Sequence, residues 1–572
     1  MRAEDSRVRQ SQLVSTFGVG SILPAGEQSY PVCGLDDWDE RWCAPVEEPR
    51  LAKSLGVHHF RSPSTGQRRG DVPVVRFPAF QYCPGCRRLD NYWKFDSRRM
   101  QCPECVRELT PSRFVACCEN GHLEEFPYYQ WVHRMADGRE SQEKVAEHRM
   151  TLLTRGASSS LADIVVHCSC GVPARDLDGA FNKNAIAMVK PCGGRRPRLP
   201  GSEHEACDKN LRALQRGSSN VWFGAVRSSI SIPPWSSPNA RYVTRFWEVF
   251  HDRDDNHIRV AAEGAAARDR TIDVEGVLEV VAQRRGVERA RIPTEAELRA
   301  EEYLALRDGN DAGSSDAFQC IEVEVAPEVS GVVAQVSRVS RLREVRALHG
   351  FSRVTPMATD GTEPKLARLS AAPRDWLPAI EVYGEGVFVR VDEAWLAHWE
   401  GGAVAKQRGR MLEAAITLRA KESGAPAVEV PTSRFLAMHT LAHAVLKELS
   451  LNAGYPVGAL RERVYAADGR AGFLIYTASS DAAGSPGGLA APANEDRFAD
   501  VLVAAASRAE WCSNDPVCAE SGPSGSDGLN LAACHACLLL PETSCEDRNI
   551  YLDRVSLVGG LEGAEAGLLT GM

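Results

Sequence analysis

Apolar residues recur with two different periods in the second half of the chain. Residues 433–449 (SRFLAMHTLAHAVLKEL) have the spacing of an α-helix, and Thr432 or Ser433 can cap its first turn. Residues 471–477 (AGFLIYT) form an unbroken apolar run, which predicts a buried strand. Alternating runs at 320–326 and 380–391 predict two further strands, the second containing glycine turns.

Helical and loop patterns separate these elements. Residues 250–310 are acidic and helical in pattern, and 295–306 predict a solvated amphipathic helix. A helix is also predicted over 128–150, with loops at 308–316 and 480–490. Since 572 residues exceed what one hydrophobic core usually organises, we expect an α+β, multi-domain protein. Its predicted parts are an N-terminal segment (1–60), a basic zinc ribbon (61–118), a second cysteine-rich region (119–250), an acidic mixed region (251–430) and a C-terminal helix and strand module with a zinc cluster (431–572).

The cysteines give the strongest chemical signal. Fifteen of the eighteen fall into three groups, and the clearest is Cys83-Pro-Gly-Cys86 followed by Cys102-Pro-Glu-Cys105. Two CxxC pairs at this spacing are typical of a tetrahedral zinc site. Disulfides are the alternative, but the N-terminus lacks the apolar core of a signal peptide, so we expect a reducing cytoplasm. No apolar run approaches the length of a membrane-spanning helix.

Two further groups predict more zinc, so we expect two or three structural sites. The second group is Cys168, Cys170, Cys192 and Cys207 with the preceding pair Cys117 and Cys118, and Cys118 and His122 are competing ligands for its ion. The third contains five thiols for a four-coordinate ion, and their spacing leaves open which is excluded: Cys512, Cys518, Cys534, Cys537 and Cys545. Cys33, Cys43 and Cys320 have the pattern of ordinary buried thiols.

Two histidines share one face of the predicted helix at 433–449. His439 and His443 are four residues apart, a spacing that can bind zinc. The HExxH metalloprotease motif requires a glutamate after the first histidine, and Thr440 occupies that position. We therefore expect helix packing here, with a buried polar pair as the second interpretation.

Charge separates the two halves of the chain. Residues 1–250 hold 34 basic and 28 acidic residues, and the remainder holds 33 and 48. Any phosphate contact should therefore lie toward the N-terminal half. The ribbon mixes cations with aromatic residues, a composition that suits DNA binding: Arg87, Arg88, Tyr92, Trp93, Lys94, Arg98 and Arg99. Alternatively, the aromatic residues pack the ribbon's own core. No P-loop motif is present, so we expect no ATP hydrolysis by that route.

Several segments in one order resemble the DrmB family, the B subunit of the bacterial DISARM anti-phage defence systems. They include RQSQLVSTFGVGSIL (9–23), CENGHLEEFPY (118–128), RLREVRALHGFSRV (341–354), EVYGEGVFVR (381–390) and LNLAACHACLLLPETSCEDRNIYLDR (529–554), in addition to the ribbon. The C-terminal part, 433–558, is also similar to the zinc-binding module of MrfA-type DNA-repair helicases.

The resemblance implies a non-catalytic accessory subunit. It would pair with a separate superfamily 2 helicase, DrmA, and help that helicase load on and recognise phage DNA. Neither a membrane nor a small-molecule substrate is expected. Two other functions stay open. One is a scaffold without DNA contact, and the other is a zinc-dependent hydrolase or nuclease built on His122, Glu124 and Glu125 or on His439 and His443.

Overall fold

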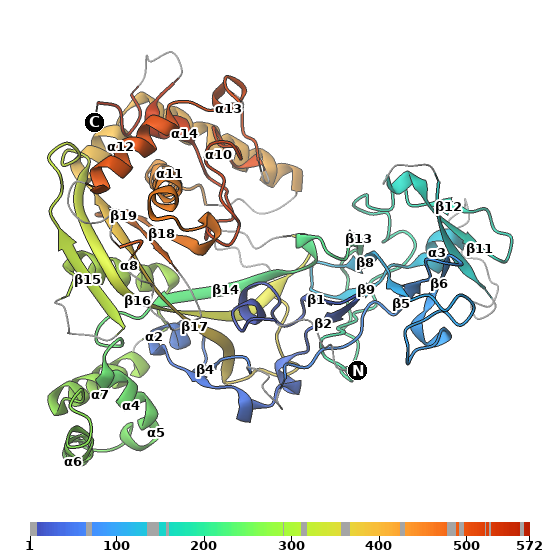
Figure 1. Cartoon of the computed structure of the whole chain (residues 1–572), viewed down its shortest axis with the longest axis horizontal. Coiled ribbons are helices and arrows are strands. Elements are labelled where there is room, and N and C mark those ends of the chain that lie inside the picture. Colours follow the sequence, from blue (N-terminus) through green and yellow to red (C-terminus); the bar gives the residue numbers. More distant parts are fainter. Residues whose placement is uncertain are drawn as a thin grey trace.

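A computed structural model describes most of the chain. The described residues are 8–64, 71–133, 148–155, 160–289, 291–310, 317–355, 366–423, 429–477, 488–490, 497–520, 522–525, 528–560 and 566–571. The predicted loops at 308–316 and 480–490 lie mostly outside them. The protein mixes helices and sheets in several structural units, as the sequence predicts (Figure 1). Across the described helices, none is long and apolar enough to cross a membrane.

An eight-stranded sheet forms the centre of the molecule (Figure 1). Its main path runs β14-β16-β17-β19-β18, with β15 pairing β16 and the β3–β4 pair joined to β17 through β4. All pairs are antiparallel except β4 with β17. The strands are β3 (Pro45–Val46), β4 (His59–Arg61), β14 (Phe223–Ile230), β15 (Phe318–Val323), β16 (Val333–Ser352), β17 (Trp376–Val391), β18 (Leu460–Ala467) and β19 (Arg470–Thr477). The sheet thus joins segments from four of the five predicted parts.

Helices cover both faces of this sheet, which explains the unbroken apolar run of β19. Phe473 and Ile475 pack with α11 (Ser433–Ala453), while Leu474 and Tyr476 face the opposite core with α8 (Glu295–Asp308). Alternate side chains of a strand point to opposite faces, so a strand covered on both faces is apolar at nearly every position. The predicted strand at 471–477 and helix at 433–449 are therefore confirmed, with Thr432 accepting a hydrogen bond from the Phe435 amide.

The C-terminal module surrounds α11 with further helices (Figure 1). These are α9 (Glu393–Glu400), α10 (Ala403–Ser423), α12 (Arg497–Ala509), α13 (Val517–Glu520) and α14 (Arg554–Val558). A separate small core holds the acidic helical region: α4 (Pro238–Arg245), α5 (Trp247–Phe250), α6 (Asp255–Ala266) and α7 (Val274–Arg289). The prediction of a solvated helix at 295–306 is wrong for one face, because Glu302, Tyr303 and Leu306 of α8 are buried against the sheet.

Short strands organise the cysteine-rich N-terminal region at the other end of the molecule (Figure 1). A six-stranded sheet has the order β12-β11-β10-β6-β5-β7, and a three-stranded sheet has the order β13-β8-β9. Their strands are β5 (Phe80–Tyr82), β6 (Arg88–Asn91), β7 (Thr110–Pro111), β8 (Phe114–Cys117), β9 (Leu123–Glu125), β10 (Met150–Thr154), β11 (Ile164–Cys168), β12 (Arg175–Asp176) and β13 (Arg212–Gln215). Of the predicted helix at 128–150, the structure describes α3 (Tyr128–His133); residues 134–147 lie outside the described ranges, and Met150 begins a strand.

The N-terminal segment packs on the central sheet instead of folding alone. It contains α1 (Gln12–Ser15), β1 (Ile22–Ala25), β2 (Gln28–Pro31) and α2 (Pro49–Ser54). Val14, Val19 and Trp38 share a core with Phe351 of β16 and Trp376 of β17. This segment therefore links the central sheet to the cysteine-rich end.

Candidate metal centres and a basic surface

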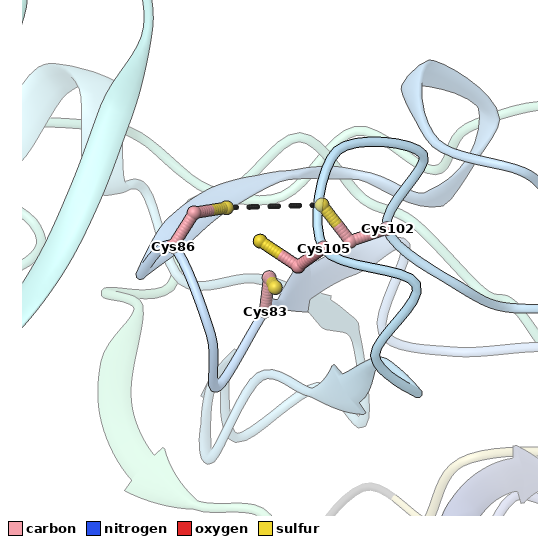
Figure 2. Close-up of side chains that lie close together, drawn as sticks. All are labelled: Cys83, Cys86, Cys102 and Cys105. Atoms are coloured by element: carbon pink, nitrogen blue, oxygen red, sulfur yellow. Dashed lines mark hydrogen bonds between the residues drawn. The ribbon is translucent and has the colours of Figure 1, made fainter.

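Two matching turns build the ribbon cluster. Cys83 and Cys86 lie between β5 and β6, and the Arg87 amide donates to the Cys83 carbonyl at 2.9 Å. Cys102 and Cys105 repeat this turn, with the Val106 amide donating to the Cys102 carbonyl at 2.8 Å. The residue after each turn, Arg87 or Val106, has a positive φ. The repeated geometry aims all four sulfurs at one point (Figure 2).

Close packing in the ribbon restricts one position between the cysteines. A side chain at Gly85 would lie 3.1 Å from Cβ and 3.2 Å from Sγ of Cys105. Such contacts are tighter than ordinary van der Waals separations, so a larger residue at position 85 would require Cys105 to move by a few tenths of an ångström.

The sulfur separations fit a tetrahedral metal ion. Zn–S bonds of about 2.3 Å place neighbouring sulfurs about 3.8 Å apart, whereas a disulfide requires about 2.0 Å. Cys86 and Cys102 are 3.7 Å apart, and all eighteen cysteines are free thiols. The donor set and its dimensions therefore suit zinc and exclude a disulfide in this arrangement.

The predicted second site is divided into two clusters. Cys192 and Cys207 approach Cys118 and His122 beside the three-stranded sheet, with sulfur separations from Cys118 of 3.7 and 3.8 Å. His122 Nδ1 lies 3.3 Å from the Cys118 sulfur, and its Nε2 is 3.3 Å from a Glu205 oxygen. A carboxylate behind an imidazole fixes the tautomer that a metal requires. The two competing ligands thus belong to the same cluster as Cys192 and Cys207.

Cys168 and Cys170 lie elsewhere, and their grouping with Cys192 and Cys207 is wrong. They meet His133, at the end of α3, and His148, before β10. His133 Nε2 is 3.3 Å from the Cys170 sulfur, and His148 Nδ1 is 3.4 Å from the Cys168 sulfur. The other ring nitrogen of His133, Nδ1, donates to the Tyr129 carbonyl at 2.7 Å. The strand β11 carries Cys168 into the six-stranded sheet, which separates it from the loop that holds Cys192.

The C-terminal cluster contains four of the five predicted thiols. Cys512 and Cys518 meet Cys534 and Cys537, with separations of 3.5 Å for Cys512–Cys534 and 3.8 Å for Cys518–Cys537. Burial raises the pKa of the Cys534 thiol, but N–H donors from Cys537 and Asn514 outweigh it and lower that pKa to about 6. Cys545 is excluded because the chain beyond Cys537 carries it to the histidines of α11.

The two glutamates that follow His122 in the sequence accept hydrogen bonds from backbone amides. Glu124 accepts from the Gly193 amide at 2.6 Å and pairs with Lys190. Glu125 accepts from the Ala79 amide at 2.6 Å, and burial raises its pKa to about 7. Both carboxylates therefore fasten neighbouring loops to β9.

The ribbon cations divide into exposed and paired groups. Arg88 is half-buried, 3.1 Å from Asp90 and stacked 4.6 Å from the Phe95 ring, and Lys94 lies 3.3 Å from Asp90. Tyr92 is half-buried beneath Arg76. The exposed members of the predicted DNA-binding set are Arg87, Trp93, Lys94, Arg98 and Arg99, and of these Lys94 is paired with Asp90. Trp93, in a 3-10 turn (Tyr92–Lys94), is 59% exposed and contacts the edge of Tyr92.

A comparison with curated proteins finds a relative that spans nearly the whole chain. The DISARM protein DrmB of Bacillus paralicheniformis is 30% identical over 566 residues, which covers 95% of this chain and 99% of the relative. The chain belongs to the DrmB family. The resemblance seen in the sequence is thereby confirmed, and the protein is a DISARM protein.

Two family models match parts of this DrmB family member. Residues 9–223 match a domain of unknown function, DUF8724, and residues 441–538 match the MrfA Zn-binding domain. The second match includes the cysteine cluster formed by Cys512, Cys518, Cys534 and Cys537. The zinc prediction is therefore confirmed for the DrmB chain, whose described residues contain several clusters that can hold the ion.

Proposed function

We propose that this chain is an accessory DISARM subunit that contacts DNA beside a superfamily 2 helicase. The observation that carries the proposal is the exposure of Arg87, Arg98, Arg99 and Trp93 on one small ribbon. Guanidinium groups bind phosphates regardless of sequence, and an exposed indole can stack on a base. The family membership supports a role in a DISARM system.

Zinc has a structural role in this proposal. The ribbon core is small: its buried members are Cys83, Phe95, Met100, Cys102 and Leu109. Such a core buries too little apolar surface to order the two turns alone, so metal binding at Cys83, Cys86, Cys102 and Cys105 would supply the folding free energy. The other three clusters would hold zinc similarly. Helicase loading and ATP hydrolysis would require the partner.

The experiment is a DNA-binding titration with and without the helicase partner, on single-stranded and tailed duplex DNA at two salt concentrations. The test variant reverses three exposed charges: Arg87→Glu, Arg98→Glu and Arg99→Glu. Each lost contact with a duplex phosphate reduces the slope of log affinity against log salt by about 0.9, so the full variant should lower the slope by up to about 3.

A matched control reverses three exposed arginines in the segments that flank α6, a helix at the far end of the molecule from the ribbon (Figure 1): Arg253→Glu, Arg268→Glu and Arg270→Glu. Both variants change the net charge equally, so a general electrostatic effect would weaken binding in both. Loss confined to the ribbon variant, with unchanged zinc content, supports the proposal. Equal loss, or none in either, contradicts it.

A scaffold role is the second candidate, and one observation favours it. Arg88 and Lys94 are paired with Asp90, so the basic surface is smaller than the sequence charge indicates. If both variants still co-purify with the helicase while DNA affinity stays at the level of the helicase alone, the scaffold role is the better explanation. Metal-dependent DNA cleavage by the purified chain would instead indicate a nuclease.

A further inference from the structure

A further group of metal-ligand side chains lies inside the C-terminal module, away from the cysteine cluster. His439 and His443 come from α11, Glu462 from β18, and Cys545 from the segment before α14. Their ligand atoms lie within 4.8 Å of one another, and no member is more than 4% exposed. The match to the MrfA Zn-binding domain covers residues 441–538 and so does not contain the whole group, because His439 and Cys545 fall outside it.

The contacts within this buried group are short. His439 Nε2 lies 2.9 Å from Glu462 Oε1 and 3.2 Å from the Cys545 sulfur, and His443 Nε2 lies 3.1 Å from the same carboxylate oxygen. Tetrahedral zinc separates nitrogen from oxygen by about 3.3 Å and nitrogen from sulfur by about 3.5 Å. An outward movement of a few tenths of an ångström therefore accommodates an ion.

The tautomer of His443 places two hydrogen-bond acceptors against each other. His443 Nδ1 lies 3.0 Å from the Leu538 carbonyl oxygen, which can only accept, so Nδ1 carries a proton. In a neutral imidazole, Nε2 then presents a lone pair, and this lone pair faces the carboxylate of Glu462. Two acceptors at this distance require either a metal ion or a proton between them, carried by His443 or by Glu462.

Two further observations favour the metal. Glu462 Oε2 is buried and has no hydrogen-bond partner among the described residues. The Asn549 amide donates to the Cys545 sulfur at 3.3 Å, a contact that stabilises a thiolate. A divalent ion with one carboxylate, one thiolate and two neutral imidazoles has no net charge, which suits a dry interior.

We propose that His439, His443, Glu462 and Cys545 form a closed metal centre, separate from the cysteine cluster of the C-terminal module. The mixed nitrogen, oxygen and sulfur donors suit zinc, and four protein ligands leave no open position for a substrate. This replaces the sequence expectation of simple helix packing at His439 and His443. It also assigns Cys545 to a different ion from Cys512, Cys518, Cys534 and Cys537.

The position of this centre indicates its role. Glu462 and Arg463 are neighbours on β18 and point to opposite faces of the sheet. On the far face, buried Arg463 pairs with Glu302 at 2.7 Å, Glu344 at 3.2 Å and Glu546 at 3.4 Å. Since Glu546 directly follows Cys545, the metal and the ion pairs would fasten the same C-terminal segment to both faces of β18.

The test counts metal ions on the full-length protein by native mass spectrometry and elemental analysis. With all four other clusters filled, wild type should hold five ions. Cys545→Ser and His443→Gln should each hold one fewer. The control is Cys320→Ser, a buried thiol outside the clusters that donates to the Leu306 carbonyl at 3.3 Å; it should match wild type.

Folded Cys545→Ser and His443→Gln chains with the wild-type ion count would overturn the proposal and indicate a proton between His443 and Glu462. An anomalous difference map of wild-type crystals at the zinc edge makes the test independent of variant folding. A peak among these four side chains supports the metal centre. Peaks at the other clusters with none here refute it.

Discussion

Removing one ligand from each of the two cysteine and histidine clusters of the N-terminal region tests whether they hold separate ions. Cys170 belongs with His133, His148 and Cys168, whereas Cys207 belongs with Cys118, His122 and Cys192. The two sets share no side chain. We therefore expect Cys170→Ser and Cys207→Ser each to release one zinc and the double variant to release two.

The structural consequences should also be separate. Structural zinc sites in small peptides contribute about 10 to 16 kcal/mol of apparent binding free energy, comparable to the net stability of a whole domain. Loss of an ion should therefore unfold the surrounding loops. In hydrogen exchange, Cys170→Ser should lose protection at β10 and β11, while Cys207→Ser should lose it at β8, β9 and β13.

The assay combines zinc release, measured with a colorimetric chelator, with hydrogen exchange resolved to peptides. Cys117→Ser is the matched control, because Cys117 is buried next to Cys118 in the sequence but belongs to none of the clusters among the described residues. If the two sets of ligands formed one shared site, each single variant would lose one ion and the double variant would also lose only one. That result would refute the division into two clusters.

Three further predictions concern stability, pH and base stacking. Arg463→Met should destabilise the protein by at least about 3 to 5 kcal/mol in urea unfolding, because Glu302, Glu344 and Glu546 would lose a buried cation. If the midpoint and slope of its urea unfolding curve match those of wild type, the ion pairs of Arg463 do not stabilise the protein. Burial lowers the pKa of His349 from 6.5 to about 4, so between these values the unfolded state binds a proton that the folded state excludes. The contribution of His349 to the free energy of unfolding is therefore complete above pH 6.5 and falls by up to about 1.4 kcal/mol per pH unit toward pH 4. The difference in unfolding free energy between wild type and His349→Asn should follow that slope, and a difference independent of pH would contradict it. Trp93→Ala should weaken single-stranded DNA binding by about 1 to 3 kcal/mol in fluorescence titrations, whereas Trp511→Ala, another exposed indole, should not. Equal effects of the two substitutions would exclude specific stacking.

Local patterns in the sequence were sufficient for elements whose partners are close in the chain. Each CxxC turn of the ribbon closes through hydrogen bonds within five residues, so its spacing carries the geometry. The helix at 433–449 likewise follows from its period and its cap at Thr432. The apolar run of β19 predicted a strand, although only the structure shows that α8 covers its second face.

Local patterns could not predict which residues from distant parts of the chain lie together. Cys168 and Cys192 are close in sequence, but strand pairing places β11 in a different sheet from β8 and β9. His133 and His148 follow no ligand spacing and became candidates only after Cys168 and Cys170 were positioned. The charge pattern also could not reveal that Asp90 pairs with Arg88 and Lys94.

The two ends of the molecule would depend on metal for different reasons. The ribbon has five buried residues in its core and contains two of the proposed ligands among them, so little apolar surface remains to fold it without an ion. In the C-terminal module, α11 is buried among apolar side chains from the sheet, α12 and α14, which can order the helix without metal. There the ions would instead fix segments that contain no helix or strand, such as the one from Cys534 to Cys545. Zinc would therefore create the fold at the proposed DNA-contacting end and position the chain terminus at the other.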